Sequence, residues 1–269
     1  MAHVAILVHR YDLFKDAPYF LYEISKMWEE EGIRVTVLQG PDTYVPADAI
    51  FLHVDLTVVP VDHRIFARRY PVAINLHAVD CSKRVVSRHL LEPNSPWRGR
   101  VIIKTDLNSM GIRETQLASQ GRFPQDQAFL IREYPILDSL KEVPAQVWAN
   151  RHLVVEKFQP EMIDGFYCLR TWMFLGSGET NSLSYSIEPI VKASTVVKRE
   201  ALDDVPLLLR ELREELGFDF GKFDYALVDG EVVLYDANRT PTLGAFSREQ
   251  VLPRLRPLAA GLQSLLSAS

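Results

Sequence analysis

The sequence has few cysteines, no long apolar run and no large excess of charge of either sign. Its two cysteines, Cys81 and Cys168, lie far apart and give no spacing for a disulfide framework or a zinc site. No apolar stretch approaches the roughly 18 residues that a membrane-spanning helix requires. The 30 basic and 35 acidic residues leave a net charge of −5, which disfavours a nucleic-acid or acidic-membrane surface. We therefore expect a cytoplasmic protein without a membrane or nucleic-acid partner.

Common enzyme motifs are also missing. The chain contains no G-x-S-x-G and no H-E-x-x-H sequence. After the first apolar segment, Val8-His9-Arg10-Tyr11 stands where a dinucleotide-binding domain carries G-x-G-x-x-G. These absences give no support for a nucleophilic serine, a metalloprotease site or a nicotinamide-dependent first domain.

The first part of the chain predicts a small open α/β layer. Four apolar segments are typical of buried strands, at residues 3–8, 33–38, 49–54 and 72–76. Apolar residues at helical spacing lie between them, at residues 18–31 and 63–70. This order is that of parallel βαβ units. Because prolines and Gly99 interrupt the pattern near residue 95, we expect one domain over residues 1–95 and a second over residues 96–269.

The second part has a different pattern. Strand-like segments follow one another without long helices, at residues 151–158, 166–175 and 183–186, which predicts an antiparallel sheet. Two helices are predicted, over about residues 204–216 and 248–266, although Pro253 and Pro257 oppose helix in the first half of the latter. Between these helices, Asp229-Gly230 separates two apolar strands and predicts a β-hairpin.

The rim of this hairpin carries the main chemical signal. Asp224 and Asp236 lie on opposite strands, and Asn238 follows Asp236 by two residues, so that the last two side chains point to one face. Mg²⁺ prefers a few carboxylates together with phosphate oxygens, and this donor set therefore suits a nucleotide-bound metal. The alternative is that these are ordinary strand-end surface residues, which an isolated D-x-N pattern favours.

Two upstream segments suit a nucleotide as well. Lys104 ends the apolar strand at residues 101–103 and precedes a loop, a layout that can bring an ammonium and backbone amides to phosphates. Residues 153–161, LVVEKFQPE, form an apolar strand that breaks into an acidic turn, where the chain edge could meet a purine and Glu161 a ribose hydroxyl. Taken alone, Lys104, Glu156 and Glu161 would be plain surface charges.

The order of a strand ending in lysine, VVEKF-x-PE, a basic strand and a D-x(11)-D-x-N hairpin resembles the ATP-grasp superfamily. The resemblance covers nearly the whole chain in layout, with its specific motifs at residues 101–104, 153–161 and 222–241. It implies a small Rossmann-like pre-ATP-grasp domain followed by an ATP-grasp fold of two α+β subdomains with mainly antiparallel sheet. The hinge would lie near residues 156–161, and the cofactors would be ATP and Mg²⁺, or Mn²⁺ in its place.

The resemblance also implies roles for individual residues. The expected nucleotide contacts are Lys104 and Lys192 on the phosphates, Glu156, Lys157 and Phe158 around adenine, and Glu161 on the ribose. The expected metal ligands are Asp224, Asp236 and Asn238. The expected catalytic cations are Lys222 at the developing oxyanion, Arg170 at the phosphates and Arg239 at an acidic substrate or the γ-phosphate. For Arg170, Lys192 and Lys222, ordinary strand-surface charge is an equal alternative, and Arg239 could instead be a structural partner of the metal carboxylates.

The sequence departs from the family pattern in two places. The loop after Lys104 contains a single glycine, Gly111, where the family has a glycine-rich flap. The stretch between Leu91 and Val101 is short, and only Lys83 could replace the phosphate-binding lysine that family members often carry there.

The implied activity is that of a ligase that activates a carboxylate as an acyl phosphate for attack by an amine or thiol. The alternatives are a kinase acting on a small-molecule hydroxyl and a protein that binds ATP without turnover. The expected partners are the small-molecule substrates, and many family members form homodimers. We expect the acceptor between the first domain and the hairpin, where the predicted strand ends put His9, Arg10, Asn75 and His77.

Overall fold

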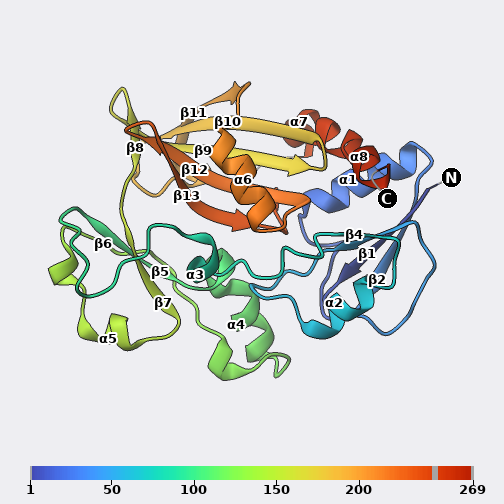
Figure 1. The fold of residues 1–269 in the computed structure, drawn as a ribbon, viewed down its shortest axis with the longest axis horizontal. Coiled ribbons are helices and arrows are strands. Elements are labelled where there is room, and N and C mark those ends of the chain that lie inside the picture. The colour runs from blue at the N-terminus through green and yellow to red at the C-terminus, as the bar shows by residue number, and fades with distance from the viewer. Residues whose placement is uncertain (1, 244–247, 268–269) are drawn as a thin grey trace.

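The computed structural model describes residues 2–243 and 248–267, and Figure 1 shows its helices and strands. The first sheet is parallel with the order β2-β1-β3-β4. Its strands are β1 (His3–Val8), β2 (Arg34–Gln39), β3 (Ala49–Leu52) and β4 (Val72–Ile74), and its main helices are α1 (Phe20–Glu30) and α2 (Val61–Ala67). All six residues of β1 are buried, because the two faces of the sheet pack against α1 and α2.

A small antiparallel sheet follows, with the order β6-β5-β7. Its strands are β5 (Val101–Thr105), β6 (Ile136–Leu137) and β7 (Leu153–Lys157). Three short helices accompany it, α3 (Lys83–Val86), α4 (Ile112–Ser119) and α5 (Ala145–Ala149). Single 3-10 turns lie at η1 (Asn108–Gly111), η2 (Gln125–Gln127), η3 (Leu140–Glu142) and, later in the chain, η4 (Ala193–Thr195).

The largest sheet is antiparallel throughout, with the order β11-β10-β9-β12-β13 and β8 beside β9. Its strands are β8 (Glu161–Ile163), β9 (Phe166–Leu175), β10 (Gly178–Ser186), β11 (Val196–Leu202), β12 (Phe220–Val228) and β13 (Glu231–Asn238). Helix α6 (Leu207–Glu215) covers one face through Leu209 and Leu212, which pack on Trp172 and Phe223. Helices α7 (Arg248–Ala260) and α8 (Leu262–Leu266) and the small sheet lie on the opposite side of the large sheet.

One apolar core joins the first sheet to the largest one. Helix α1 packs against α7, and Trp28 of α1 donates from its indole nitrogen to the Ala259 carbonyl at 3.0 Å. The same core includes Phe51 of β3 and Phe220 of β12, whose rings meet edge to face at 5.3 Å. These contacts fix the parallel sheet beside the end of the antiparallel one.

The predicted fold class is confirmed: a parallel α/β layer precedes antiparallel sheets. The predicted hairpin also forms, with Asp229 and Gly230 both at positive φ, 53° and 83°. Helix α6 begins after Pro206, three residues later than the predicted start, and Pro253 and Pro257 both lie inside α7. Strand β11 was not predicted, because it is a half-exposed edge strand without a continuous apolar face.

The parallel sheet ends at Ile74 and the next strand begins at Val101. A domain division near residue 95 stays a prediction. Among the described residues, no helix is long and apolar enough to cross a membrane.

Candidate active site

The hairpin β12–β13 brings the predicted metal acids together. Its register pairs Asp224 with Asp236 and Lys222 with Asn238, so these four residues share one face of the sheet. That face is opposite the one covered by α6, because the intervening Phe223 and Ala237 pack in the core beneath α6. The sheet therefore presents two carboxylates side by side on its uncovered face.

A β-bulge at Tyr235 adds an aromatic ring to this face. The register shifts between Asp224 and Tyr225, so that Asp236 pairs with Asp224 but Leu234 pairs with Tyr225. Tyr235 is the extra residue, and both Tyr235 and Asp236 line one cavity although they are adjacent in the chain. Bulges re-aim side chains in this way beside functional sites. The Tyr235 hydroxyl is fixed by donating to the Gln159 carbonyl at 2.6 Å.

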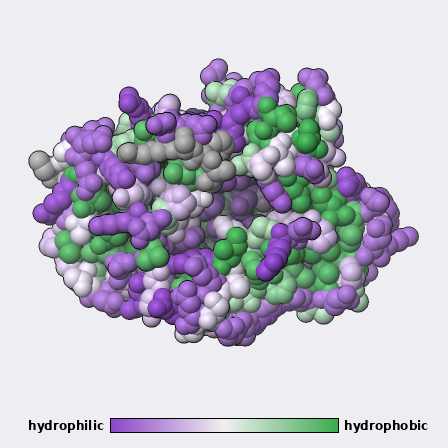
Figure 2. Space-filling model, turned by 180° about the vertical axis from the view of Figure 1, so that it is seen from behind, coloured by the Kyte–Doolittle hydropathy of each residue, from purple (hydrophilic) through white to green (hydrophobic). Residues whose placement is uncertain are grey.

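A cavity of about 260 Å³ lies between this face and the small sheet. One part of its lining is apolar, from Ile102, Phe158, Leu169, Ile190 and Tyr235. The other part is charged and holds Lys83, Lys104, Asp224 and Asp236. Seen from behind, the molecule is hollowed near its centre (Figure 2). We call the space that these residues line the first cavity.

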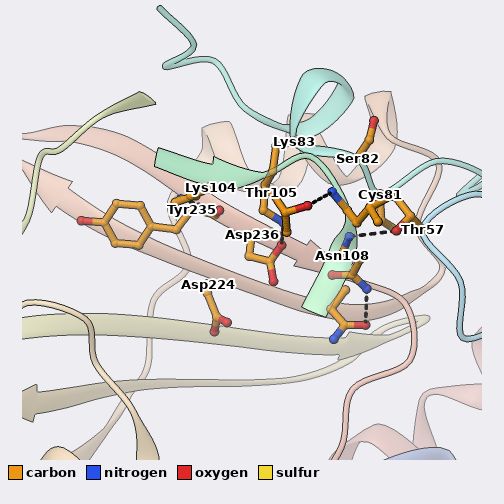
Figure 3. A network of polar contacts seen from close by, with 12 residues as sticks. Thr57, Cys81, Ser82, Lys83, Lys104, Thr105, Asn108, Asp224, Tyr235 and Asp236 are labelled. Atoms are coloured by element: carbon orange, nitrogen blue, oxygen red, sulfur yellow. Dashed lines mark hydrogen bonds and ion pairs between the residues drawn. The ribbon is translucent and has the colours of Figure 1, made fainter. Parts of the chain in front are cut away.

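Three lysine–carboxylate pairs occur in this region. They are Lys83–Asp236 at 2.6 Å, Lys222–Asp224 at 2.6 Å and Lys104–Glu156 at 2.7 Å. Figure 3 shows Lys83 reaching Asp236, with Asp224 on the neighbouring strand. The three pairs together carry no net charge, so an added polyphosphate would bring a negative charge that divalent cations and the lysines must balance.

The electrostatics of the Lys83–Asp236 pair keep both partners ionised. Burial opposes the charged form of Lys83, but the Asp236 carboxylate outweighs it, and the pKa of Lys83 is raised above its usual range. Burial likewise acts to raise the pKa of Asp236, but the ammonium groups of Lys83, Lys222 and Lys104 hold it below its ordinary value. Asp236 is therefore an anion surrounded by cations at neutral pH.

The predicted adenine segment borders the apolar part of the first cavity. Lys157 and Phe158 line it, and residues 158–160 carry the chain from β7 in the small sheet to β8 in the large one. The side chain of Glu156 is buried on Lys104 instead of facing the cavity. The backbone amides of Lys157 and Phe158 donate to the carbonyls of His89 and Arg100, both at 3.0 Å.

Glu161 and Arg170 are bound to each other. Arg170 donates from Nε and Nη2 to the Glu161 carboxylate at 2.7–3.1 Å, and the same carboxylate accepts the Leu227 amide at 2.9 Å. Neither residue lines the first cavity. The pair joins β8, β9 and β12, and the expected roles at the ribose and the phosphates have no support from this geometry.

The expected contact of Arg239 with an acidic substrate or the γ-phosphate requires a correction. Its side chain is 1% exposed and donates to the backbone carbonyls of Val54, Leu56, Thr57 and Ala78. These carbonyls belong to loops of the N-terminal part of the chain, so the guanidinium joins the end of β13 to that layer. Arg239 is therefore a structural residue and cannot contact substrate from this position.

Two further cavities adjoin the hairpin. The second, of about 440 Å³, is lined by Lys192, Lys222 and Asp224, among others, so the structure brings Lys192 near the hairpin but not into the first cavity. The third, of about 380 Å³, is lined by Asp12, Asp55 and Asn238. The Asn238 side-chain oxygen accepts the Thr240 amide at 2.8 Å and thus lies toward the third cavity. We call these spaces the second and third cavities.

The residues expected at the acceptor take other positions. Asn75 is buried and hydrogen-bonded to Asp219 and Phe220. Arg10 pairs with Asp42 at 2.9 Å on the surface, and the ring of His9 stacks on that of His63 at 6.0 Å. None of the four, His77 included, lines any of the three cavities. Strands β1 and β4 end at Val8 and Ile74, and these four residues follow them, but a role at the acceptor stays a prediction.

Sequence reasoning missed Tyr134 and Tyr235, two aromatic residues that line the first cavity. Burial raises the pKa of Tyr134 to about 12, so its hydroxyl remains protonated. Tyr134 lies in a segment between strands and has no local motif, and Tyr235 reaches the cavity through the bulge. Lys83 was predicted only as a replacement for the phosphate-binding lysine that family members often carry. The structure shows it buried at the start of α3, with its ammonium donating to Asp236.

The donor set fits a divalent cation bound together with phosphate oxygens. Within the described residues, no cluster of three or more His, Cys, Asp or Glu side chains could hold a metal by itself. Asp224 and Asp236 are two carboxylates on one face, each already balanced by a lysine. A cation held by two carboxylates needs further oxygens, which a nucleotide supplies.

The comparisons with known proteins concern the fold. No protein-family model and no curated protein matches the chain. Many solved structures match it, among them three that align over almost the full length of both chains. The ATP-grasp ligase PsnB, complexed with a minimal precursor, has a TM-score of 0.57 at 10% identity, covering 100% of this chain and 98% of that one.

The second match is the macrocyclase MdnC from Microcystis aeruginosa MRC, bound with precursor peptide MdnA. Its TM-score is 0.55 at 11% identity, with 99% of this chain and 100% of that chain covered. The third is a RiPP-associated ATP-grasp ligase from Chryseobacterium gregarium in complex with ADP and a leader and core peptide, with a TM-score of 0.52, 8% identity, and 100% and 98% coverage. Because the likeness extends over the whole length of each chain, this protein has the ATP-grasp fold.

Proposed function

We propose that the protein is an ATP- and Mg²⁺-dependent ligase that activates a carboxylate as an acyl phosphate and joins it to an amine. The observation that carries this proposal is the meeting of three cavities of different character around one hairpin. The first is half apolar and half charged, the second is basic and the third is acidic. A ligase requires three such sites, for a nucleotide, an anionic acceptor and a cationic amine.

The nucleotide would occupy the first cavity. Its base would lie against Phe158, Leu169 and Tyr235, beside the segment that links the two sheets. Its phosphates would approach Lys83 and Lys104. Asp224 and Asp236 would hold Mg²⁺, with Asn238 at the edge of the same face, and the metal would neutralise charge on the β- and γ-phosphates.

The acceptor carboxylate would occupy the second cavity. Asp224, Leu169 and Val191 line both the first and the second cavity, so the two spaces meet at the metal acids. Lys222 lies at this junction and would stabilise the oxyanion of the tetrahedral intermediate. One acceptor oxygen attacks the γ-phosphorus, ADP leaves, and an acyl phosphate results.

The amine would enter through the third cavity. Asp12 and Asp55 line it, and the Tyr19 hydroxyl lies 3.0 Å from a carboxylate oxygen of each. Burial raises the pKa of Asp12 to about 6, a value suited to accept a proton from an ammonium near neutral pH. The amine nitrogen then attacks the acyl carbon and phosphate leaves. A thiol carries no positive charge that an acidic cavity would attract, and for this reason we favour the amine.

A trapping assay tests this proposal. The protein is incubated with ATP, Mg²⁺, a panel of carboxylates and hydroxylamine, and both ADP and hydroxamate are measured. Since the similar structures were solved with peptides, the panel includes acidic peptides as well as small carboxylic acids. A ligase yields hydroxamate in proportion to ADP. A kinase would form a stable phosphorylated hydroxyl compound without hydroxamate, and ATP binding without ADP release would indicate a non-catalytic protein.

A further inference from the structure

The third cavity adjoins both of the other two. It shares Ser109 with the first cavity and Thr242 with the second. The chain that leaves β13 is fixed beside the start of α1, where the Phe20 amide donates to the Pro241 carbonyl at 3.0 Å. A ligand in the third cavity therefore lies next to both spaces in which we place the nucleotide and the carboxylate.

Two carboxylates of the third cavity share one hydroxyl group. The Tyr19 hydroxyl lies 3.0 Å from Oδ2 of Asp12 and 3.0 Å from Oδ2 of Asp55. Burial and the two carboxylates raise the pKa of Tyr19, so the hydroxyl keeps its proton. A hydroxyl has one hydrogen to donate and can form a full hydrogen bond with only one of the two acids. The other carboxylate oxygen is then left without a donor from this group.

Asp12 lacks hydrogen-bond donors on its other side as well. Its side chain is buried, and its Oδ1 has no hydrogen-bond partner among the residues that the structure describes. Arg113 Nη2 lies 3.9 Å from Asp12 Oδ2, which is beyond hydrogen-bond distance, and donates instead to the Tyr11 carbonyl at 2.8 Å. A buried carboxylate oxygen without a donor lowers stability, and a bound cation with N–H groups would remove that cost.

The lining of the third cavity carries an excess of negative charge. Among the described residues that line it are three acids and one base, Asp12, Asp16, Asp55 and Arg113. Asp55 accepts the Thr240 hydroxyl at 2.7 Å but forms no ion pair within the described part of the chain. The cavity therefore suits a cation that can donate several hydrogen bonds. An ammonium group, with its N–H donors, meets this requirement.

Apolar side chains border the same cavity. Leu13 and Ile112 line it, although they are 64% and 56% exposed. They come from the loop after β1 and from the start of α4, which the bond from Arg113 to Tyr11 connects. Single exposed apolar side chains are common, but two at an acidic cavity of about 380 Å³ match a ligand that joins an ammonium to an apolar group. A hydrated metal ion would make no use of them.

We propose that the third cavity selects a primary amine with an apolar side group. The ammonium binds Asp12 and Asp55, and the apolar group contacts Leu13 and Ile112. This inference rests on the proposed function for the assignment of the amine as the nucleophile. The same chemistry is present in a free alkyl amine and in the amino terminus of a peptide whose first residue is apolar.

Ligand titration followed by NMR tests the subsite without turnover. Three probes of equal size are compared at neutral pH: pentylamine, ethoxyethylamine, in which an ether oxygen replaces one methylene, and n-pentanol, which has no charge. We expect pentylamine to bind at least about threefold more tightly than ethoxyethylamine, as for burial of one methylene group. It should bind at least about tenfold more tightly than n-pentanol, as for loss of charge-assisted hydrogen bonds. Equal binding of pentylamine and either analogue would overturn the proposal.

Variants separate the two kinds of contact. In Asp12→Asn and in Asp55→Asn, the preference for pentylamine over n-pentanol should fall to about twofold or less, because the carboxylate charge is lost. Asp55 is the less buried of the two acids, so Asp55→Asn carries the test if Asp12→Asn does not fold. The double variant Leu13→Ser with Ile112→Ser should lose the preference over ethoxyethylamine and keep that over n-pentanol. Both of these side chains are exposed, and circular dichroism establishes that each variant is folded.

Two substitutions outside the cavity are the matched controls. Asp229→Asn changes an acid at the exposed hairpin turn, and Leu207→Ser changes a leucine at the start of α6 that is 70% exposed. Both should keep both preferences, and loss of either preference in its control would refute the subsite. Thermal unfolding with KCl and with MgCl₂ examines inorganic cations. Stabilisation by either salt that depends on Asp55, without binding of pentylamine, would identify an inorganic cation site and overturn the proposal.

A peptide arm distinguishes the source of the amine. The tripeptide amide Leu-Ala-Ala is compared with Ser-Ala-Ala and with N-acetylated Leu-Ala-Ala. Tighter binding of free Leu-Ala-Ala than of pentylamine, dependent on Asp55, identifies a peptide, and the reverse identifies a small amine. Because these titrations need no ATP, amine binding that depends on Asp55 without hydroxamate formation would sustain the subsite while refuting the ligase. Hydroxamate formation without any preference for pentylamine would do the opposite.

Discussion

The Lys83 ammonium lies 2.6 Å from the Asp236 carboxylate, although the two residues are 153 positions apart in the sequence. Lys83 starts a four-residue helix after the N-terminal layer, whereas Asp236 lies on the last strand of the large sheet. The pair occupies the first cavity, where a metal and phosphates would compete for its two partners. Nucleotide binding would therefore exchange this contact for two others: Lys83 with phosphate and Asp236 with the cation.

The first prediction concerns Asp236. Asp236→Asn keeps the shape of the side chain and removes its charge, so Mg²⁺-dependent ADP release should fall by roughly 100-fold or more, as for loss of one preorganised electrostatic group. Asp229→Asn is the control, because Asp229 lies at the exposed hairpin turn with a positive φ of 53° that asparagine also tolerates. Both variants are compared by ADP release at equal folded concentration. Wild-type turnover in Asp236→Asn would remove Asp236 from the site.

The second prediction concerns Lys83. Lys83→Gln should weaken ATP binding by about tenfold or more, because one charge-assisted contact with phosphate is lost. The same change leaves Asp236 without its nearest cation, so added Mg²⁺ should raise the melting temperature of Lys83→Gln more than that of the wild-type protein. Thermal unfolding with and without Mg²⁺ measures this difference. Lys141→Gln, at an exposed position of η3, should behave like the wild-type protein in both respects.

The third prediction separates structure from catalysis at Arg239. Arg239→Gln should lower the free energy of unfolding by about 3–5 kcal/mol, because buried carbonyls of the N-terminal layer lose their donor. The dissociation constant for ATP, measured on the folded fraction at low temperature, should remain unchanged. Urea unfolding and ATP titration test the two parts, with the exposed Arg256→Gln as control. Intact stability together with lost ATP binding would restore a role at the phosphates.

The fourth prediction concerns pH. His53 is 0% exposed, and neither of its ring nitrogens has a hydrogen-bond partner among the residues that the structure describes. Burial, with a smaller effect of the Arg239 charge, lowers the pKa of His53 to about 3. The unfolded chain therefore binds a proton below about pH 6.5 that the folded protein does not, so stability falls as the pH decreases from about 6.5 toward 3.

His53→Phe should remove this contribution. Its ring can keep the edge-to-face contact that His53 makes with Tyr19 at 4.7 Å. Between pH 7.5 and pH 5, the wild-type protein should lose about 2 kcal/mol more of its free energy of unfolding than the variant does. Urea unfolding at both pH values gives the difference. His9 and Asp12 also titrate abnormally, but they are present in both proteins and cancel in the comparison.

Local patterns in the sequence were sufficient for most of the fold. Alternating or continuous apolar runs gave β1, β9 and the two strands of the hairpin, because burial of one or both faces is written into their residues. The elements that were missed, such as β11, pack only in part and carry charge on both sides. Propensity is a weak guide for such edge elements, since their place depends on the strand beside them.

The candidate site was only partly predictable, because local patterns do not show which segments will lie beside one another. The turn at Asp229-Gly230 sets a register that by itself would pair Asp224 with Tyr235, and the bulge at Tyr235 shifts it so that Asp224 faces Asp236. The turn can be read from adjacent residues, but the bulge cannot. Glu161 and Arg170 were expected at a nucleotide, but in the tertiary structure each is the nearest opposite charge to the other, at 2.7 Å. A sequence does not show which of several cations an acid will meet.

The sequence by itself determined most of the elements, the turn of the hairpin and the type of donors on its rim, since these follow from periodicity and turn chemistry within a few residues. Tertiary structure alone decided that Lys83 reaches Asp236, that Arg239 is buried among N-terminal carbonyls, and that basic and acidic cavities adjoin the same strands. The physical reason is that these contacts join segments far apart in the chain, with separations of 153 residues for Lys83 and Asp236 and 161 residues for Arg239 and Ala78.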